Sequence, residues 1–385
     1  MSTTLLRPGR IPELDATRGA AMLAVCLSHS AYLVGKQWWT TLGYALLTVG
    51  MIATPTFLLL SGIVCGYLSA TRKGPARAFR WYLVDRGLFL LLVVHSVLGL
   101  LHVVWRHDIA ALTGSFYITD AVGVGLVVGA IVVGRLSPRL LVTMGASLLL
   151  VSWTIANLEP TGTPAARNLV RLLFGLYESG TSEEGYIVPV IPYLGIFIIG
   201  MAAGLEYARR RAAGESMEKL AGLCIRSGLI GVAIACVVKV AWLVGKPLVA
   251  MQWRDLVYHL TEPRQKLPPG PAYLLAYAGA GAVLTGITGK LNIDALGSRF
   301  VALFAVVGRA SLFVFVAQYV IYFVPALGFH LGAGTWFWSF PVSLVVLWGL
   351  AWAWDAARGN RLLTLGIGRA ARTFSRRSVP EGESR

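Results

Sequence analysis

Long apolar segments alternate with short polar ones along almost the whole chain. Most of the apolar segments approach or exceed the roughly 20 residues that a helix needs to cross the hydrocarbon core of a bilayer. The pattern predicts ten membrane-spanning helices, at residues 15–35, 43–70, 87–105, 117–134, 140–157, 187–206, 220–245, 271–289, 300–327 and 335–356. We therefore expect an all-α integral membrane protein, with one helical bundle over residues 15–356 and a short N-terminal segment, 1–14, before it.

The composition supports this fold class. Hydrophobic residues make up 56% of the 385 residues and charged residues only 14%, whereas soluble domains carry about 25% charged residues. The net charge of +16 does not indicate a nucleic-acid partner, because the Lys and Arg residues cluster beside the predicted spans rather than along one soluble face. The four cysteines lie inside apolar stretches without metal-ligand spacing, so we expect no metal site and no permanently bound cofactor.

The basic residues also predict an orientation. If the N-terminus lies inside, the inner segments hold 22 Lys and Arg residues and the outer loops eight. Cytoplasmic loops are normally the richer in these residues, so we expect both termini to be cytoplasmic and the protein to be a multi-pass protein of the cell (inner) membrane. The segment 357–385 is basic and then rich in Ser and Glu, which predicts a disordered tail that lies on membrane lipids.

Three polar residues interrupt the first predicted span, "LDATRGAAMLAVCLSHS". Arg18 and His29 are eleven residues apart, which is about 20° past three full helical turns, so they lie on one face about 16 Å apart along the axis. Asp15, three residues before Arg18, joins the same stripe. Ionisable groups at this depth usually face a bundle interior or a water-filled cavity, although an interhelical hydrogen bond of His29 and a lipid contact of Arg18 remain alternatives.

Several segments together resemble the membrane-bound acyltransferase superfamily, which includes the acyltransferase-three, periplasmic glucan succinyltransferase and heparan-α-glucosaminide N-acetyltransferase families. The first span resembles the opening motif of that superfamily, and "TPTFLLLSGIVCGYL", with Ser61 and Gly62, is similar to its second-helix signature. The segments "RAFRWYLVDRGLFLLL", "IPYLGIFIIGMAAG" and "GRASLFVFVAQYVIYF" resemble later parts in the same order. Gln318 stands in the last segment, where the family often has His.

The resemblance implies transfer of an acyl group, acetyl or succinyl, from a cytoplasmic acyl-CoA to a hydroxyl or amine of a carbohydrate or glycolipid acceptor outside. An imidazole titrates near neutral pH, so His29 is the candidate general base or acyl carrier, with Arg18 and Asp15 as further catalytic candidates. Planar guanidinium groups suit phosphates, so we expect the donor at Arg18, Arg80, Arg86 and Arg309. Ser61, His95 and Gln318 are candidate lining residues.

The residues by themselves leave other functions open. Intramembrane charges also fit a transporter of a small molecule or lipid-linked precursor, and a non-catalytic membrane protein of the same fold would share the pattern. Ser61 with Gly62 also suits close helix packing, His95 an interhelical hydrogen bond, and Arg309 a contact with lipid phosphates.

Overall fold

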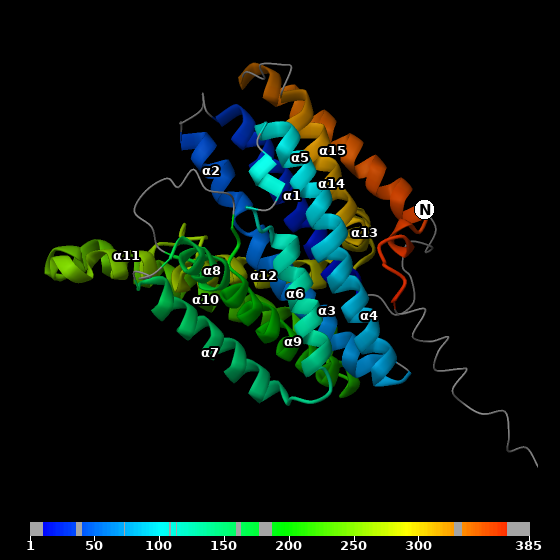
Figure 1. The fold of residues 1–385 in the computed structure, drawn as a ribbon. Coiled ribbons are helices and arrows are strands. Elements are labelled where there is room, and N and C mark those ends of the chain that lie inside the picture. The colour runs from blue at the N-terminus through cyan, green and yellow to red at the C-terminus, as the bar shows by residue number, and fades with distance from the viewer. Residues whose placement is uncertain are drawn as a thin grey trace, which may run out of the picture.

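Helices account for nearly all of the structure, which is a computed structural model that describes residues 11–35, 41–72, 74–107, 109–112, 114–158, 163–176, 187–326 and 333–367. Within these ranges the only β contact is an isolated parallel bridge between Phe116 and Ile187. The helices, shown in Figure 1, are α1 (Pro12–Gly35), α2 (Thr41–Gly50), α3 (Ala53–Thr71), α4 (Ala76–Phe89), α5 (His95–Arg106), α6 (Ile118–Val132), α7 (Pro138–Ala156), α8 (Pro164–Phe174), α9 (Val190–Ala212), α10 (Met217–Gly245), α11 (Arg254–Thr261), α12 (Pro271–Leu291), α13 (Ala295–Arg309), α14 (Ser311–Ala326) and α15 (Ala333–Ala356).

The described residues contain seven helical segments that are long and apolar enough to cross a membrane, and the bent pair α13–α14 makes an eighth. The seven are Gly43–Thr71, Ala76–Trp105, Pro138–Ala156, Val190–Ala212, Met217–Leu248, Pro271–Leu291 and Thr335–Ala356. Helices also occupy the other two predicted positions, but α6 has only 15 residues, and polar residues such as Arg18 and His29 lower the hydropathy of α1. The all-α integral membrane fold is confirmed, while the count of ten spans and the orientation stay predictions.

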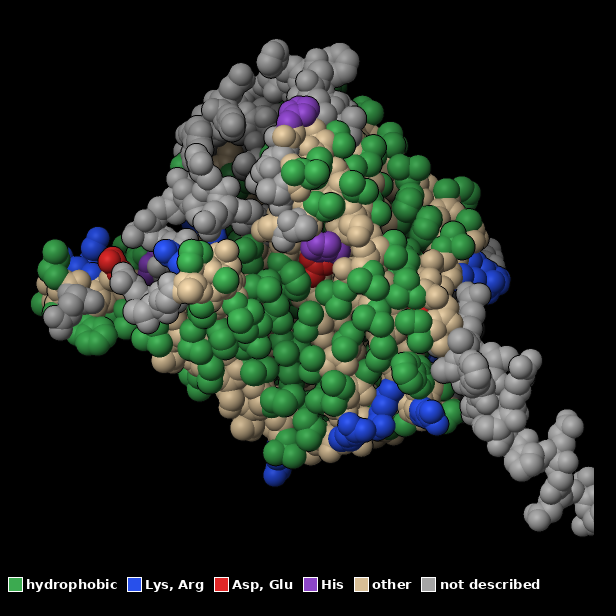
Figure 2. Space-filling view, viewed as in Figure 1, with side chains coloured by type: hydrophobic (Ala, Val, Ile, Leu, Met, Phe, Trp, Pro, Cys, Tyr) green, Lys and Arg blue, Asp and Glu red, His purple; other side chains and the backbone are tan. Residues whose placement is uncertain are grey.

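The surface of the bundle agrees with a membrane environment. Figure 2 shows a broad face of hydrophobic side chains, with basic side chains at its margins, along the lower edge and at the right and left. Large apolar side chains along α10 are exposed, among them Leu229, Ile230, Val237, Leu243 and Val244. Apolar patches of this extent are rare on soluble monomers and are the normal surface of a protein in lipid.

Small residues bring α3 and α9 into backbone contact. A Cβ atom on Gly62 would lie 2.0 Å from the carbonyl oxygen of Phe197, and one on Gly204 would lie 2.0 Å from that of Ile63. Only glycine fits at such distances, which is the usual way that membrane helices approach closely. The Gly62 of the second-helix motif therefore has a packing role, as the sequence alternative proposed.

The first helix lies at the centre of the molecule, where it packs against α2, α3, α12, α13, α14 and α15. Its contact with α13 is again made by glycines, since a Cβ on Gly308 would lie 1.7 Å from the carbonyl oxygen of Asp15 and one on Gly19 would lie 1.9 Å from that of Phe304. The chain then bends by 73° between α13 and α14. Because of this bend, α13 crosses the first turns of α1 and α14 runs along its later turns.

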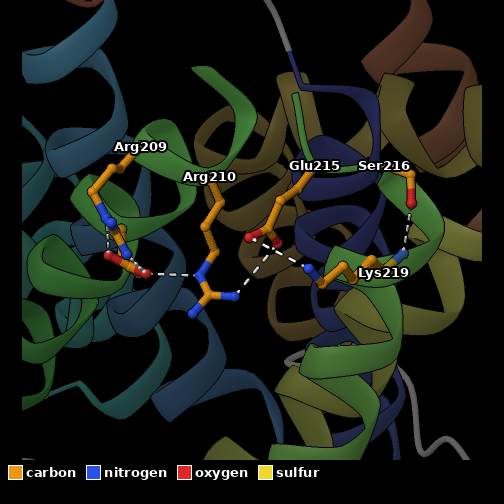
Figure 3. Close-up of polar contacts among 6 residues, drawn as sticks. Arg209, Arg210, Glu215, Ser216 and Lys219 are labelled. Atoms are coloured by element: carbon orange, nitrogen blue, oxygen red, sulfur yellow. Dashed lines mark hydrogen bonds and ion pairs between the residues drawn. The ribbon is translucent and has the colours of Figure 1, made fainter. Parts of the chain in front are cut away.

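Charged side chains hold the turn between α9 and α10, as Figure 3 shows. Glu206 accepts hydrogen bonds of 2.7 Å from both Arg209 and Arg210, and Arg210 also reaches Glu215 at 3.4 Å. Lys219 lies 3.7 Å from Glu215, and its backbone N–H donates to the hydroxyl of Ser216, which caps α10. Part of the positive charge assigned to the inner side is thus balanced by neighbouring carboxylates.

The first part of the C-terminal segment is folded against the bundle. Asp85 of α4 accepts hydrogen bonds from the Thr364 hydroxyl and, at 2.9 Å, from the backbone N–H of Ile367. Arg86 donates to the carbonyl oxygens of Leu363 and Asn360. The prediction of disorder from residue 357 onward is therefore wrong for 357–367, because two buried or half-buried polar side chains of α4 need partners and this segment supplies them. Residues 368–385 lie outside the described part.

Candidate active site

His29 lies in α1 against three aromatic side chains of α14. Its ring centroid is 5.5 Å from that of Tyr319, 6.0 Å from that of Phe323 and 6.5 Å from that of Phe315. Its Nδ1 atom is buried and has no hydrogen-bond partner among the described residues, although the side chain as a whole keeps intermediate accessibility. A buried ring nitrogen without a partner loses its hydrogen bonds to water, so its position calls for a ligand or a chemical role.

The local sequence explains why α1 can carry this residue to the centre. Pro12 begins the helix, Glu13 and Asp15 lie in its first turn next to the positive end of the helix dipole, and the helix continues without a break to Gly35. The predicted spacing therefore holds, and Arg18 lies on the same helical face as His29. Asp15 and Arg18 are half-buried beside the crossing of α1 and α13.

Two more histidines, both in α5, extend this group of side chains beyond α1. The ring of His102 in α5 lies 5.3 Å from that of Tyr319 and 5.1 Å from that of Tyr117. The ring of His95, about two helical turns before His102, lies 5.7 Å from the ring of the same Tyr117. Tyr319 and Tyr117 thus link three histidines into one cluster, which we call the imidazole cluster: His29, His95, His102, Tyr117 and Tyr319.

An acidic residue anchors the far end of the imidazole cluster. Asp120 is fully buried, and its Oδ2 accepts hydrogen bonds from His95 Nδ1 at 2.9 Å and from the backbone N–H of Tyr117 at 2.7 Å. His95 Nε2 lies 3.3 Å from the carbonyl oxygen of Leu112. Both ring nitrogens of His95 therefore face oxygen atoms, one of the Asp120 carboxylate and one of a backbone carbonyl.

A π-helical segment, Leu90–Val94, stands directly before His95 and joins α4 to α5. Such a wide turn rotates the residues after it relative to those before it, and π segments occur often at functional sites. Here it separates the basic part of α4 from the histidines of α5. The sequence predicted one continuous span at this place and gave no sign of the wide turn.

Gln318 of α14 is, after His29 of α1, a second polar side chain here without a partner among the described residues. It is fully buried, and neither its amide oxygen nor its amide nitrogen has a hydrogen-bond partner among the described residues. One turn later, Tyr322 shares a hydrogen bond with Cys26 of α1 and accepts one from Ser343 of α15 at 3.1 Å. Gln318 precedes Tyr322 by four residues and so lies toward the same junction of α1, α14 and α15.

The predicted donor-binding arginines occupy two separate places. Arg309 is buried at the bend between α13 and α14, where its Nε lies 2.9 Å from Asp355 Oδ2, and its carbonyl oxygen accepts a bond from Asn360 at 2.7 Å. Arg86 donates to the carbonyl oxygen of the same Asn360. Arg80 instead donates to the carbonyl oxygen of Val133, at the end of α6, at 3.3 Å. The structure therefore joins Arg86 with Arg309 through Asn360, and the contacts of Arg80 lie with α6.

Ser61 is half-buried on α3, and within the described part of the chain it makes none of the ring contacts or hydrogen bonds of the imidazole cluster. Tyr117 and Tyr319 belong to the cluster and Asp120 binds its His95, but the sequence analysis missed all three. The signal for Asp120 was its position, since an acid that directly follows "YIT" at the start of an apolar run often caps a helix. No group of three or more His, Cys, Asp or Glu residues among the described ones could hold a metal ion.

Two family models match the chain, and each covers more than half of it. The model of the heparan-alpha-glucosaminide N-acetyltransferase catalytic domain matches residues 10–234, which include His29, the imidazoles of α5 and Asp120. The model of the OpgC protein matches residues 126–361, which include α14 and Asn360. No curated protein matches the chain. The two matches overlap and together cover almost the whole bundle.

Proposed function

Because the chain belongs to the membrane-bound acyltransferases, the superfamily of both matching models, it is a transmembrane acyltransferase, and we propose which groups it moves and how. The donor is a cytoplasmic acyl-CoA that carries an acetyl or succinyl group. The acceptor is a hydroxyl or amine of a carbohydrate or glycolipid on the other side of the inner membrane. The fold supports this route, since α1 passes from the polar crossing with α13 to the enclosed imidazole of His29.

The unpartnered Nδ1 of His29 is the observation that carries the proposal. In the direct route, an imidazole nitrogen takes the proton of the acceptor O–H or N–H while the acceptor atom attacks the thioester carbonyl carbon. The C–S bond then breaks, and the proton passes from the imidazolium to the CoA thiolate. In the covalent route, the imidazole nitrogen attacks the carbonyl carbon, the C–S bond breaks, and the thiolate leaves as CoA thiol with the proton that the imidazole releases. The acceptor atom then attacks the acyl-imidazole, and the acceptor's proton returns to the ring as the acyl group is transferred.

The aromatic side chains around His29 support either route. Phe315, Tyr319 and Phe323 cover the ring from one side, so bulk water has limited access to an activated acyl group. Arg18 lies on the same face of α1 toward the side that we assign to the donor, where a guanidinium can bind a CoA phosphate. For Arg86 and Arg309 the same role requires that the donor replace or join their present partners, Asn360, Leu363 and Asp355.

The test uses purified protein in vesicles with acetyl-CoA or succinyl-CoA labelled in the acyl group. We expect release of CoA thiol and label on a carbohydrate acceptor, and we expect His29→Ala to lower the rate by about 10²- to 10⁴-fold, the usual contribution of a general base. His259→Ala is the matched control, because His259 lies in α11 beside Gln265 and Tyr258, outside the imidazole cluster.

The outcome also separates the alternatives. Label that stays with the protein when acceptor is left out indicates the covalent route, and its absence with rapid turnover indicates the direct one. Transfer by His29→Ala at the wild-type rate would show that His29 is not the reacting group. Passage of unmodified acceptor across the vesicle membrane, without thioester cleavage, would favour a transporter instead.

A further inference from the structure

A cleft of about 370 Å³ lies at the far end of α10, away from the imidazole cluster and its polar groups. It is lined by Trp242, Lys246, Met251, Arg254, Asp255 and Tyr258. These residues come from the end of α10, the short 3₁₀ turns that follow it, and α11, which projects from the bundle in Figure 1. Nothing in the proposed acyl transfer uses this cleft.

The cleft lies at the level of lipid headgroups. Arg226 and Lys246 are exposed cations on α10 and its direct extension, and twenty residues of helix separate them by about 30 Å, the thickness of a bilayer hydrocarbon core. Exposed apolar side chains fill the distance between them, and the one intervening cation, Lys239, is paired with Glu262 at 2.6 Å. If Arg226 lies at one membrane surface, Lys246 lies at the other.

The charges in the cleft suit a zwitterion. The side chains of Lys246 and Asp255 have no hydrogen bond or ion pair with any described residue, although both residues line the same space. Arg254 donates from Nε to the carbonyl oxygen of Val249 at 3.0 Å and from one terminal nitrogen toward the sulfur of Met251, which fixes the guanidinium in place. Two cations and one separate carboxylate match a phosphate with an attached ammonium group.

The surroundings match the rest of a lipid molecule. Leu248 is 90% exposed and Met251 78% exposed, beside the cleft, where they can contact acyl chains. Trp242 and Tyr258 contribute amphipathic rings, which are typical of the membrane–water interface. A soluble anion such as inorganic phosphate would gain nothing from the apolar side chains.

We propose that this cleft binds the headgroup of a phospholipid of the phosphoethanolamine type, with the phosphate at Lys246 and Arg254 and the ammonium at Asp255. The lipid then fixes α11 and the end of α10 to one membrane surface. The site follows from the membrane location of the protein and does not depend on which acyl group it transfers.

Native mass spectrometry of the detergent-purified protein tests the site, with phosphatidylethanolamine and phosphatidylglycerol of identical acyl chains added in turn. We expect the wild type to retain phosphatidylethanolamine preferentially, and Lys246→Gln/Arg254→Gln to lower its affinity by about tenfold, as expected when roughly 1.4 kcal/mol of binding is lost. Arg139→Gln/Arg226→Gln is the matched control, because it removes the same charge from exposed positions outside the cleft and should leave retention unchanged.

Asp255→Asn tests the headgroup assignment separately. It should keep phosphate binding but abolish the preference for phosphatidylethanolamine over phosphatidylglycerol. Equal losses in the control pair and the cleft pair would overturn the site, because the effect would then be general attraction to lipid. A wild type that prefers phosphatidylglycerol, or an Asp255→Asn variant that keeps the wild-type preference, would overturn the ammonium contact.

Discussion

Two polar regions of this bundle differ in how their hydrogen-bonding groups are satisfied. At the bend between α13 and α14, Arg309 pairs with Asp355, and Asn360 connects Arg309 to Arg86 and Trp354. We call this region the basic corner. At the centre, His29 Nδ1 and both amide atoms of Gln318 have no partner within the described residues.

The difference distinguishes polar residues that stabilise the fold from polar residues that, under the proposed function, contact a substrate. Buried polar groups are nearly always hydrogen-bonded, because an unmet one loses its bonds to water without compensation. In the basic corner, Arg309, Asp355, Asn360, Arg86 and Trp354 each have at least one polar partner, and these bonds tie the C-terminal segment to the bundle. At the centre, His29 Nδ1 and the Gln318 amide have none within the described residues, and the proposed acyl transfer would use the free nitrogen of His29.

The largest effect on stability should come from breaking the basic corner. Arg309→Leu removes the guanidinium that pairs with the largely buried carboxylate of Asp355, which costs about 3–5 kcal/mol. The melting temperature in detergent should fall strongly, and Arg309→Leu/Asp355→Leu should recover most of the loss. Arg209→Leu is the control, since its ion pair with Glu206 is exposed and should matter little. A wild-type melting temperature for Arg309→Leu would contradict the structural role of the pair.

At the centre we expect a substitution to raise the stability of the protein instead of lowering it. Gln318→Leu removes a buried amide without partners, so the protein should become more stable by about 1–3 kcal/mol, while transfer slows if the amide binds the reacting acyl group. Thr56→Val is the control, because the Thr56 hydroxyl is also buried and unpartnered but lies against Gly281 of α12. It should raise the melting temperature and leave the rate unchanged. A lower melting temperature for Gln318→Leu would show that Gln318 is a satisfied structural residue.

The smallest effect should come from the edge of the basic corner. Thr364→Val removes the hydrogen bond from the hydroxyl to Asp85 and the one that the hydroxyl accepts from the Gly366 backbone N–H, each worth about 1 kcal/mol, while the Ile367 amide keeps its own bond to the same carboxylate. Hydrogen exchange should become faster at the Ile367 amide and stay unchanged in α13. Thr143→Val, which removes an exposed hydroxyl that bonds only to its own helix, should not change exchange at Ile367. Unchanged exchange in Thr364→Val would mean that other contacts hold the segment.

Predictions from the sequence were most accurate within single helices. The spacing of eleven positions from Arg18 to His29 determines their common face, because helical geometry depends only on local spacing. The sequence placed His95 as a lining residue, but it did not show Asp120 as its partner, since that pair joins two helices across 25 residues. Arg309 was predicted to bind the donor, yet its nearest charge is Asp355, which follows 46 residues later.

The C-terminal segment is a second case in which contacts between distant residues could not be predicted from the sequence. Its composition predicted disorder, because it has little apolar surface to bury. Folding of 357–367 depends instead on acceptors and donors that α4 and α13 present, and no local pattern in the segment reveals them.

The sequence by itself determined the membrane fold class, the superfamily and the polar stripe of α1, because hydropathy, motif order and helical period are properties of neighbouring residues. Only the tertiary structure decided which polar groups along the bundle are satisfied. A hydrogen bond forms between side chains that folding brings within about 3 Å, and their separation along the chain does not set that distance. For this reason Arg309 and Gln318, nine residues apart in one motif, differ in their surroundings: one completes a buried ion pair and the other lies without a partner at the centre.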